Sequence, residues 1–102
     1  MTRARIPIPR RKLTAFCQRY PIRRLALFGS ALREDFGPQS DVDVLVEFLP
    51  GARISFFELT TMEMELGDIL GRRVDLRTPE ELSRYFRQEV LDRAEVLYER
   101  AG

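Results

Sequence analysis

The chain has 102 residues, of which 44% are hydrophobic and 32% charged, and its formal net charge is +1. This balance is typical of a single soluble globular domain with one core, and it argues against a disordered chain, a membrane-spanning chain or a general nucleic-acid binder. The only cysteine, Cys17, excludes an internal disulfide and fits a reducing, cytoplasmic environment. Because histidine is absent, any catalysis near neutral pH has to use carboxylates or a metal ion.

A helix and two strands are expected in the first half of the chain. Pro7 and Pro9 make residues 1–9 an extended lead-in to one domain that spans residues 1–102. Residues 10–20 carry apolar side chains at i, i+3, i+4 and i+7, which is typical of an amphipathic helix. These side chains are Leu13, Phe16, Cys17 and Tyr20. The other elements expected here are a buried strand over residues 25–28, a helical turn over 31–36 and a second strand over 41–48.

Two further helices and a third strand are expected in the second half. Ser55 and Glu58 form a capping box at the start of a helix that ends at Gly71. Its apolar stripe consists of Leu59, Met62, Leu66, Ile69 and Leu70. A short strand follows over residues 73–77, and residues 78–81 open a last helix, whose spacing also allows a break midway. The apolar stripe of this last helix consists of Leu82, Phe86, Val90, Ala94 and Leu97.

This order of elements predicts a fold of the α/β (α+β) kind, a small mixed sheet with helices packed on it. The short connection between the first two strands favours an antiparallel pair, and the long helix before the third strand allows a parallel crossover. Core packing is the expected use of Phe56, Phe57 and Tyr85, with a dimer or partner interface as the alternative. The sequence leaves both the strand order and the oligomeric state open.

Carboxylates gather where the second and third strands are expected. Asp41 and Asp43 share one face of a strand with their Cα atoms about 6–7 Å apart, and such a like-charged pair is repulsive unless a cation lies between them. Gly29 and Ser30 form a turn whose backbone N–H groups suit a phosphate. Asp75 adds a third carboxylate if its strand neighbours the second one. Three carboxylates would hold one or two Mg²⁺ ions about 3.5–4 Å apart, between a triphosphate and an attacking hydroxyl; the alternative is a solvated acidic edge.

Residues 27–46 resemble a known motif: an apolar strand, Gly-Ser, a spacer, Ser-Asp-x-Asp and a second apolar strand. This is the pattern of the DNA polymerase β-type nucleotidyltransferase superfamily, and more narrowly of its minimal nucleotidyltransferase (MNT) domains. These are compact bacterial and archaeal proteins that often act as antitoxins. Because Asp75 stands where that family has its third carboxylate, the resemblance covers nearly the whole chain and implies a polymerase β-like palm core.

The resemblance also implies the roles of individual residues. The nucleotide-binding residues would be Gly29, Ser30, Arg33 and Ser40. The catalytic residues, which would also bind the metal, would be Asp41, Asp43 and Asp75. The reaction implied is an in-line attack of an acceptor hydroxyl on the α-phosphorus of ATP with release of pyrophosphate. Positioning and electrostatics would supply the catalysis, so the lack of histidine is no obstacle.

One residue departs from the family pattern, and the small size of the chain limits what it can act on. Where family members commonly continue Gly-Ser-x-Ala-Arg-Gly, this chain retains Arg33 and has Glu34 in place of the last glycine. An inward Glu34 would lower NTP affinity, whereas a Glu34 on the outside of the helical turn, the preferred reading, would not. Size excludes a templated polymerase, and the resemblance implies transfer of AMP to a tyrosine of a HEPN-domain toxin. The alternatives are an antitoxin that only binds its toxin and a nucleotide sensor.

Overall fold

The computed structural model describes residues 8–29 and 41–100. In chain order the elements are α1 (Arg10–Arg19), β1 (Ile22–Phe28), β2 (Val42–Phe48), α2 (Phe56–Leu70), β3 (Val74–Arg77), the 3₁₀ helix η2 (Pro79–Glu81), α3 (Arg87–Arg93) and β4 (Glu95–Glu99). The predicted features that lie outside the described residues are most of the extended lead-in, the helical turn over 31–36, and the residues Ser30, Arg33, Glu34 and Ser40.

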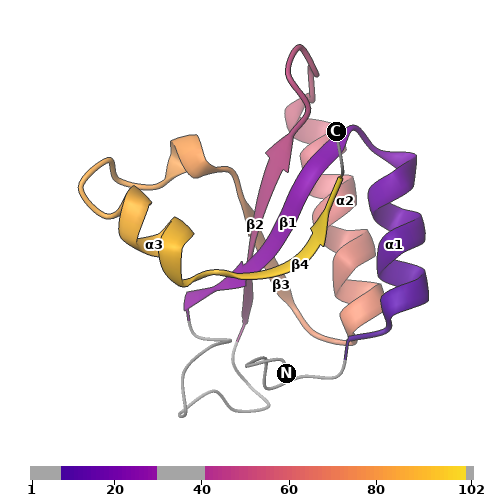
Figure 1. Cartoon of the computed structure of the whole chain (residues 1–102). Coiled ribbons are helices and arrows are strands. Elements are labelled where there is room, and N and C mark those ends of the chain that lie inside the picture. The colour runs from indigo at the N-terminus through magenta and orange to yellow at the C-terminus, as the bar shows by residue number, and fades with distance from the viewer. Residues whose placement is uncertain (1–7, 30–40, 101–102) are drawn as a thin grey trace.

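The strands form one mixed sheet in the order β3-β2-β1-β4. β1 pairs antiparallel with β2 and with β4, whereas β2 and β3 are parallel and are joined by the α2 crossover. The expected antiparallel first pair, the parallel crossover and the mixed-sheet fold class are therefore confirmed. Helices α1 and α2 lie together on one side of the sheet, and η2 and α3 lie apart from them, beyond β2 and β4 (Figure 1).

The core lies between the sheet and the pair α1 and α2. Alternation along β2 places Val42, Val44 and Val46 in this core, each with no exposed surface. Helix α1 contributes Leu13, Phe16 and Cys17, and α2 contributes Met62, Leu66 and Leu70. The apolar stripes predicted for these two helices are thus confirmed. The odd-numbered residues of β2, among them Asp43, lie on the opposite face of the sheet.

Both ends of α2 form as the sequence indicates. The Glu58 backbone N–H donates to Ser55 Oγ at 3.1 Å, and the Ser55 N–H donates to the Glu58 carboxylate at 3.4 Å. At the other end Gly71 adopts a left-handed φ of +67°, which a glycine reaches without strain. These two caps fix where α2 releases the chain into β3.

The expected last helix is wrong. Residues 79–81 form only a 3₁₀ turn, α3 covers Arg87–Arg93, and residues Glu95–Glu99 form the strand β4. The spacing that put Leu97 on a helical stripe equally fits a short strand, in which Leu97 is buried. The segment forms a strand and not a helix because the edge of β1 is free to pair with it. Leu25 pairs with Tyr98, and Ala26 pairs with Val96.

The expected burial of three aromatic side chains is also wrong. Phe56 and Phe57 are 78% and 82% exposed, and Tyr85 is 79% exposed. Phe56 and Phe57 begin α2, ahead of the turn that reaches the core, and Tyr85 lies in the linker between η2 and α3. The side chain of Tyr85 therefore extends into solvent.

Basic residues near the N-terminus are largely used for internal contacts. Arg19 forms an ion pair with Glu65, and Arg24 Nε lies 3.0 Å from Glu47 Oε2. Arg10 donates a hydrogen bond to the Leu97 carbonyl at 3.2 Å. These contacts with acidic side chains and a backbone carbonyl partly compensate the positive charge of this part of the chain. Of the helices described, none combines the length and apolarity needed to cross a membrane.

Candidate active site

Asp43 and Asp75 are direct neighbours across the parallel pair β2 and β3. The register matches Val42 with Val74 and Asp43 with Asp75. Adjacent strands lie about 4.8 Å apart, and residues at one register point to the same face. The valines face the α1 and α2 layer, so both carboxylates lie on the opposite face of the sheet. The parallel pairing on which the convergence of carboxylates depended is therefore present.

Asp41 lies two residues before Asp43, immediately ahead of β2. Its side chain is 48% exposed, and one carboxylate oxygen lies 3.8 Å from an Arg73 guanidinium nitrogen. An exposed pair at this distance contributes little to stability. The Asp41 carboxylate therefore lies at the start of β2, close to solvent and to Arg73, the residue that directly precedes β3.

Gly29 lies against the Asp43 carboxylate. It follows directly on β1, where Phe28 pairs with Asp43, and it has a left-handed φ of +63°. A Cβ atom added to Gly29 would lie 2.5 Å from Asp43 Oδ2. Only glycine therefore satisfies both the backbone conformation and the space at this position. The sequence assigned Gly29 to phosphate binding; the fold adds that the glycine makes room for a carboxylate.

Arg77 is a site residue that the sequence analysis missed. Its guanidinium donates to both oxygens of Asp75, at 3.1 and 3.2 Å. This bonding raises the pKa of Arg77, with smaller contributions from the charges of Asp75, Glu81 and Asp43. The available signal was the strand period, since residues i and i+2 of a strand share a face. Arg77 thus places a permanent positive charge among the carboxylates.

Carboxylate oxygens are the ligands that Mg²⁺ prefers, so the donor type at this site fits that ion. In the described ranges, 8–29 and 41–100, no three acidic, cysteine or histidine side chains are gathered closely enough to hold a metal ion. Asp75 accepts hydrogen bonds from Arg77, and Asp41 lies beside Arg73. A metal ion at Asp75 would have to displace the hydrogen bonds from Arg77.

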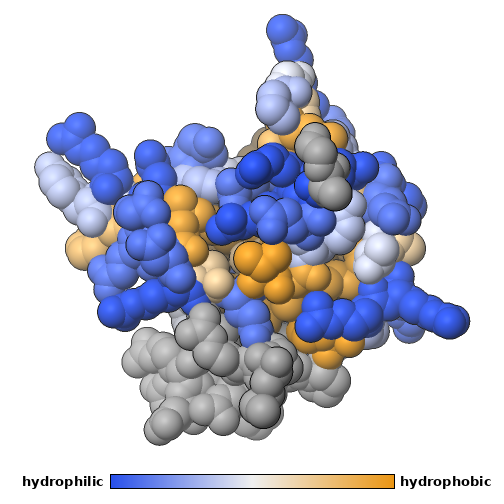
Figure 2. Space-filling view, viewed as in Figure 1, coloured by the Kyte–Doolittle hydropathy of each residue, from blue (hydrophilic) through white to orange (hydrophobic). Residues whose placement is uncertain are grey.

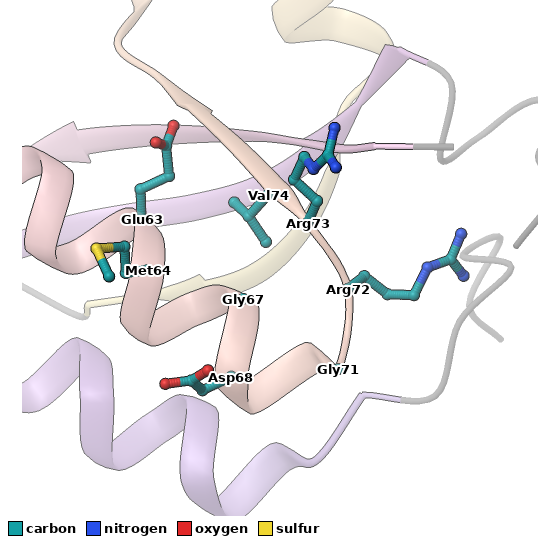
Figure 3. Close-up of a pocket in the computed structure, with 8 residues that line it drawn as sticks. All are labelled: Glu63, Met64, Gly67, Asp68, Gly71, Arg72, Arg73 and Val74. Atoms are coloured by element: carbon teal, nitrogen blue, oxygen red, sulfur yellow. The ribbon is translucent and has the colours of Figure 1, made fainter. Parts of the chain in front are cut away.

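Two hollows border β3, which is an edge strand of the sheet. The larger, about 590 Å³, lies between the last turns of α2 and the start of β3, and Glu63, Met64, Arg72 and Arg73 are among the residues that line it (Figure 3). The smaller, about 180 Å³, includes Asp75 and Arg77 in its wall. Glu63 lines both hollows, and its carboxylate accepts a hydrogen bond from the Leu76 N–H at 2.7 Å.

Carboxylates at one register of two neighbouring strands are the type of ligand that metal-dependent phosphoryl-transfer sites use. The family model of the nucleotidyltransferase domain matches residues 9–97. The chain belongs to this nucleotidyltransferase family.

Relatives and solved structures agree with this assignment. A provisionally named protein adenylyltransferase of Methanocaldococcus jannaschii is 31% identical over 85 residues, which are 83% of this chain and 89% of the relative. The structure of a provisionally named minimal nucleotidyltransferase is 30% identical, with a TM-score of 0.68 over 83% of this chain and 85% of that one. The fold that the resemblance implied is thereby confirmed.

Two toxin–antitoxin complexes share the fold at lower identity. One was solved with AMP-PNP and aligns with a TM-score of 0.71 and 19% identity over 91% of this chain and 75% of the other. The second contains a tri-AMPylated HEPN toxin of Shewanella oneidensis with its MNT antitoxin. It aligns with a TM-score of 0.63 and 19% identity over 89% of this chain and 70% of the other.

Proposed function

We propose that this protein is a Mg²⁺-dependent antitoxin that transfers AMP from ATP to a tyrosine of a HEPN-domain toxin and thereby neutralises it. The observation that carries the proposal is the pairing of Asp43 with Asp75, beside a glycine whose missing Cβ leaves room for the carboxylate. Membership of the nucleotidyltransferase family supports the reaction class. The AMP-PNP and tri-AMPylated complexes of structural neighbours support ATP and a HEPN toxin as the partners. Such a pair would act in the cytoplasm.

Each residue group has a defined role in this reaction. Gly29 and Ser30 would hold the β- and γ-phosphates with their backbone N–H groups, assisted by Arg33 and Ser40. The carboxylates of Asp41, Asp43 and Asp75 would hold Mg²⁺, which when bound withdraws charge from the triphosphate. The tyrosine hydroxyl attacks the α-phosphorus in line, the new O–P bond forms, and the bond to the leaving pyrophosphate breaks.

The test is transfer of label from ATP to the helical toxin that the neighbouring gene encodes. We expect labelled toxin with the wild type and a loss of at least about 100-fold with Asp43→Asn, since a ligand to the charged transition state is removed. Glu47→Gln is the matched control, because Glu47 lies on the same strand and face but pairs with Arg24. Equal labelling by wild type and Asp43→Asn would contradict the proposal.

A second candidate function has one observation in its favour. Both oxygens of Asp75 are occupied by Arg77, an arrangement that is already electrostatically satisfied without a metal. This favours a non-catalytic antitoxin that neutralises its toxin by forming a complex. The same experiment separates the two functions. Toxin neutralised by Asp43→Asn, with no label transferred by any variant, would establish the binding module and end the enzyme proposal.

A further inference from the structure

The smaller hollow beside β3 adjoins the proposed catalytic carboxylates. It lies between the first turns of α2 and the outer edge of β3. Its wall includes Phe56, Leu59, Thr60, Asp75, Leu76 and Arg77. Of these residues, only Asp75 belongs to the set that the resemblance assigned. The other five therefore describe a feature that the family motif does not account for.

The volume of this hollow limits what it can hold. It measures about 180 Å³. Sites for drug-sized ligands and cofactors measure about 300–1,000 Å³. The hollow is therefore too small for ATP and large enough for a single side chain of another molecule.

The wall combines apolar and charged side chains. Phe56 and Leu59 supply apolar surface, and Glu63, Asp75, Glu81 and Arg77 supply charged groups, of which Arg77 alone is positive. A phenol suits this combination, because its ring is apolar and its hydroxyl needs a polar partner when it is buried. The positive charge of Arg77 complements the negative charge that a phenolic oxygen develops as it attacks phosphorus.

Phe56 and Phe57 distinguish this hollow from the general surface. They are adjacent, similarly exposed at 78% and 82%, and in edge-to-face contact with ring centroids 6.4 Å apart. Only Phe56 lines the hollow. Because Phe56 is exposed, its ring does not contribute to the core. An exposed ring beside a charged cavity is suited to stacking on an incoming aromatic side chain.

We propose that this hollow binds the acceptor tyrosine of the partner, with its ring against Phe56 and its hydroxyl at Asp75. The inference rests on the proposed function and specifies its acceptor side. The tyrosine Oη forms a bond to the α-phosphorus of ATP, the bond between that phosphorus and the bridging oxygen breaks, and pyrophosphate leaves with the electron pair. The phenolic proton is released to water. Phe56 positions the ring and takes no part in the bond changes.

Steady-state kinetics with the neighbouring-gene toxin as acceptor test this assignment. Phe56→Ala should raise the KM for the toxin about tenfold, because an aromatic contact is lost, and leave the KM for ATP unchanged. Phe57→Ala is the matched control and should leave both constants unchanged. If the wild type transfers AMP and the two variants behave alike, the acceptor pocket is wrong while the proposed function stands.

A titration with N-acetyl-L-tyrosinamide tests the pocket without any transfer. We expect amide shifts of Leu59, Thr60 and Leu76 in ¹⁵N-labelled protein, retained in Phe57→Ala and lost in Phe56→Ala. Shifts that persist in Phe56→Ala, or that map elsewhere on the chain, would overturn the assignment. This measurement needs neither ATP nor the toxin. An inactive wild type would refute the proposed function, and the titration would still test the pocket.

Discussion

Replacement of Gly29 by alanine tests how the fold positions the Asp43 carboxylate. Alanine at a φ of +63° costs about 1–2 kcal/mol. Its Cβ would in addition lie 2.5 Å from Asp43 Oδ2, so the carboxylate has to move. The conformational cost alone lowers the melting temperature by about 4–16 °C, at roughly 4–8 °C per kcal/mol for a domain of this size.

Gly71→Ala is the matched control for this experiment. Gly71 has a similar φ of +67°, and a Cβ added there meets nothing within 4 Å. Thermal unfolding should show a comparable loss of stability in both variants. Only Gly29→Ala should shift the ¹³C resonance of the Asp43 carboxyl carbon and weaken Mn²⁺ binding, about tenfold or more, in an electron paramagnetic resonance titration.

Two results would refute this reasoning. If Gly29→Ala leaves the Asp43 resonance and the Mn²⁺ affinity unchanged, the carboxylate is not held against the glycine. If Gly71→Ala weakens Mn²⁺ binding to the same degree, the effect comes from general destabilisation and not from the contact between Gly29 and Asp43.

The remaining predictions concern a helix cap and the buried thiol. Ser55→Ala removes the capping hydrogen bond of α2 and should cost about 0.5–2 kcal/mol, measured by urea unfolding; an unchanged midpoint would contradict the cap. Burial raises the pKa of the Cys17 thiol from 9.0 to about 12, so iodoacetamide at pH 8 should label the folded protein far more slowly than the protein in urea. The unfolded thiol ionises first, so this contribution to stability is complete below pH 9 and is lost as the pH rises towards 12; a Cys17→Ala variant should lack that part of the alkaline decline.

Local signals were sufficient wherever one element's own residues determine its structure. The capping box of Ser55 and Glu58 and the left-handed Gly71 depend on contacts within a few residues of chain, so α2 was predictable to within a residue at both ends. The burial of alternate residues in β2 follows from the period of a strand, and it also placed Asp43 on the face away from the helices.

Charge pairing at the site was much less predictable. Asp75 was recognised as a third carboxylate, yet its salt bridge with Arg77 was not, although both lie on one strand. Exposed ion pairs contribute little energy, so two opposite charges at i and i+2 of a strand are only a weak signal that they pair. The same holds for the exposure of Phe56, because an apolar residue at the start of a helix fits a core contact or a free surface equally well.

The sequence by itself determined the helices α1 and α2, the strand period, the mixed-sheet class and the carboxylates on which the candidate site is built. Only the tertiary structure decided that β3 lies beside β2 with Asp43 level with Asp75, and that the C-terminal segment becomes β4. Both decisions concern strand pairing, which joins residues about thirty to seventy positions apart and depends on which sheet edge stays unfilled. Local sequence patterns do not indicate which strand edges will pair. The pairing of β2 with β3 is what brings the carboxylates together.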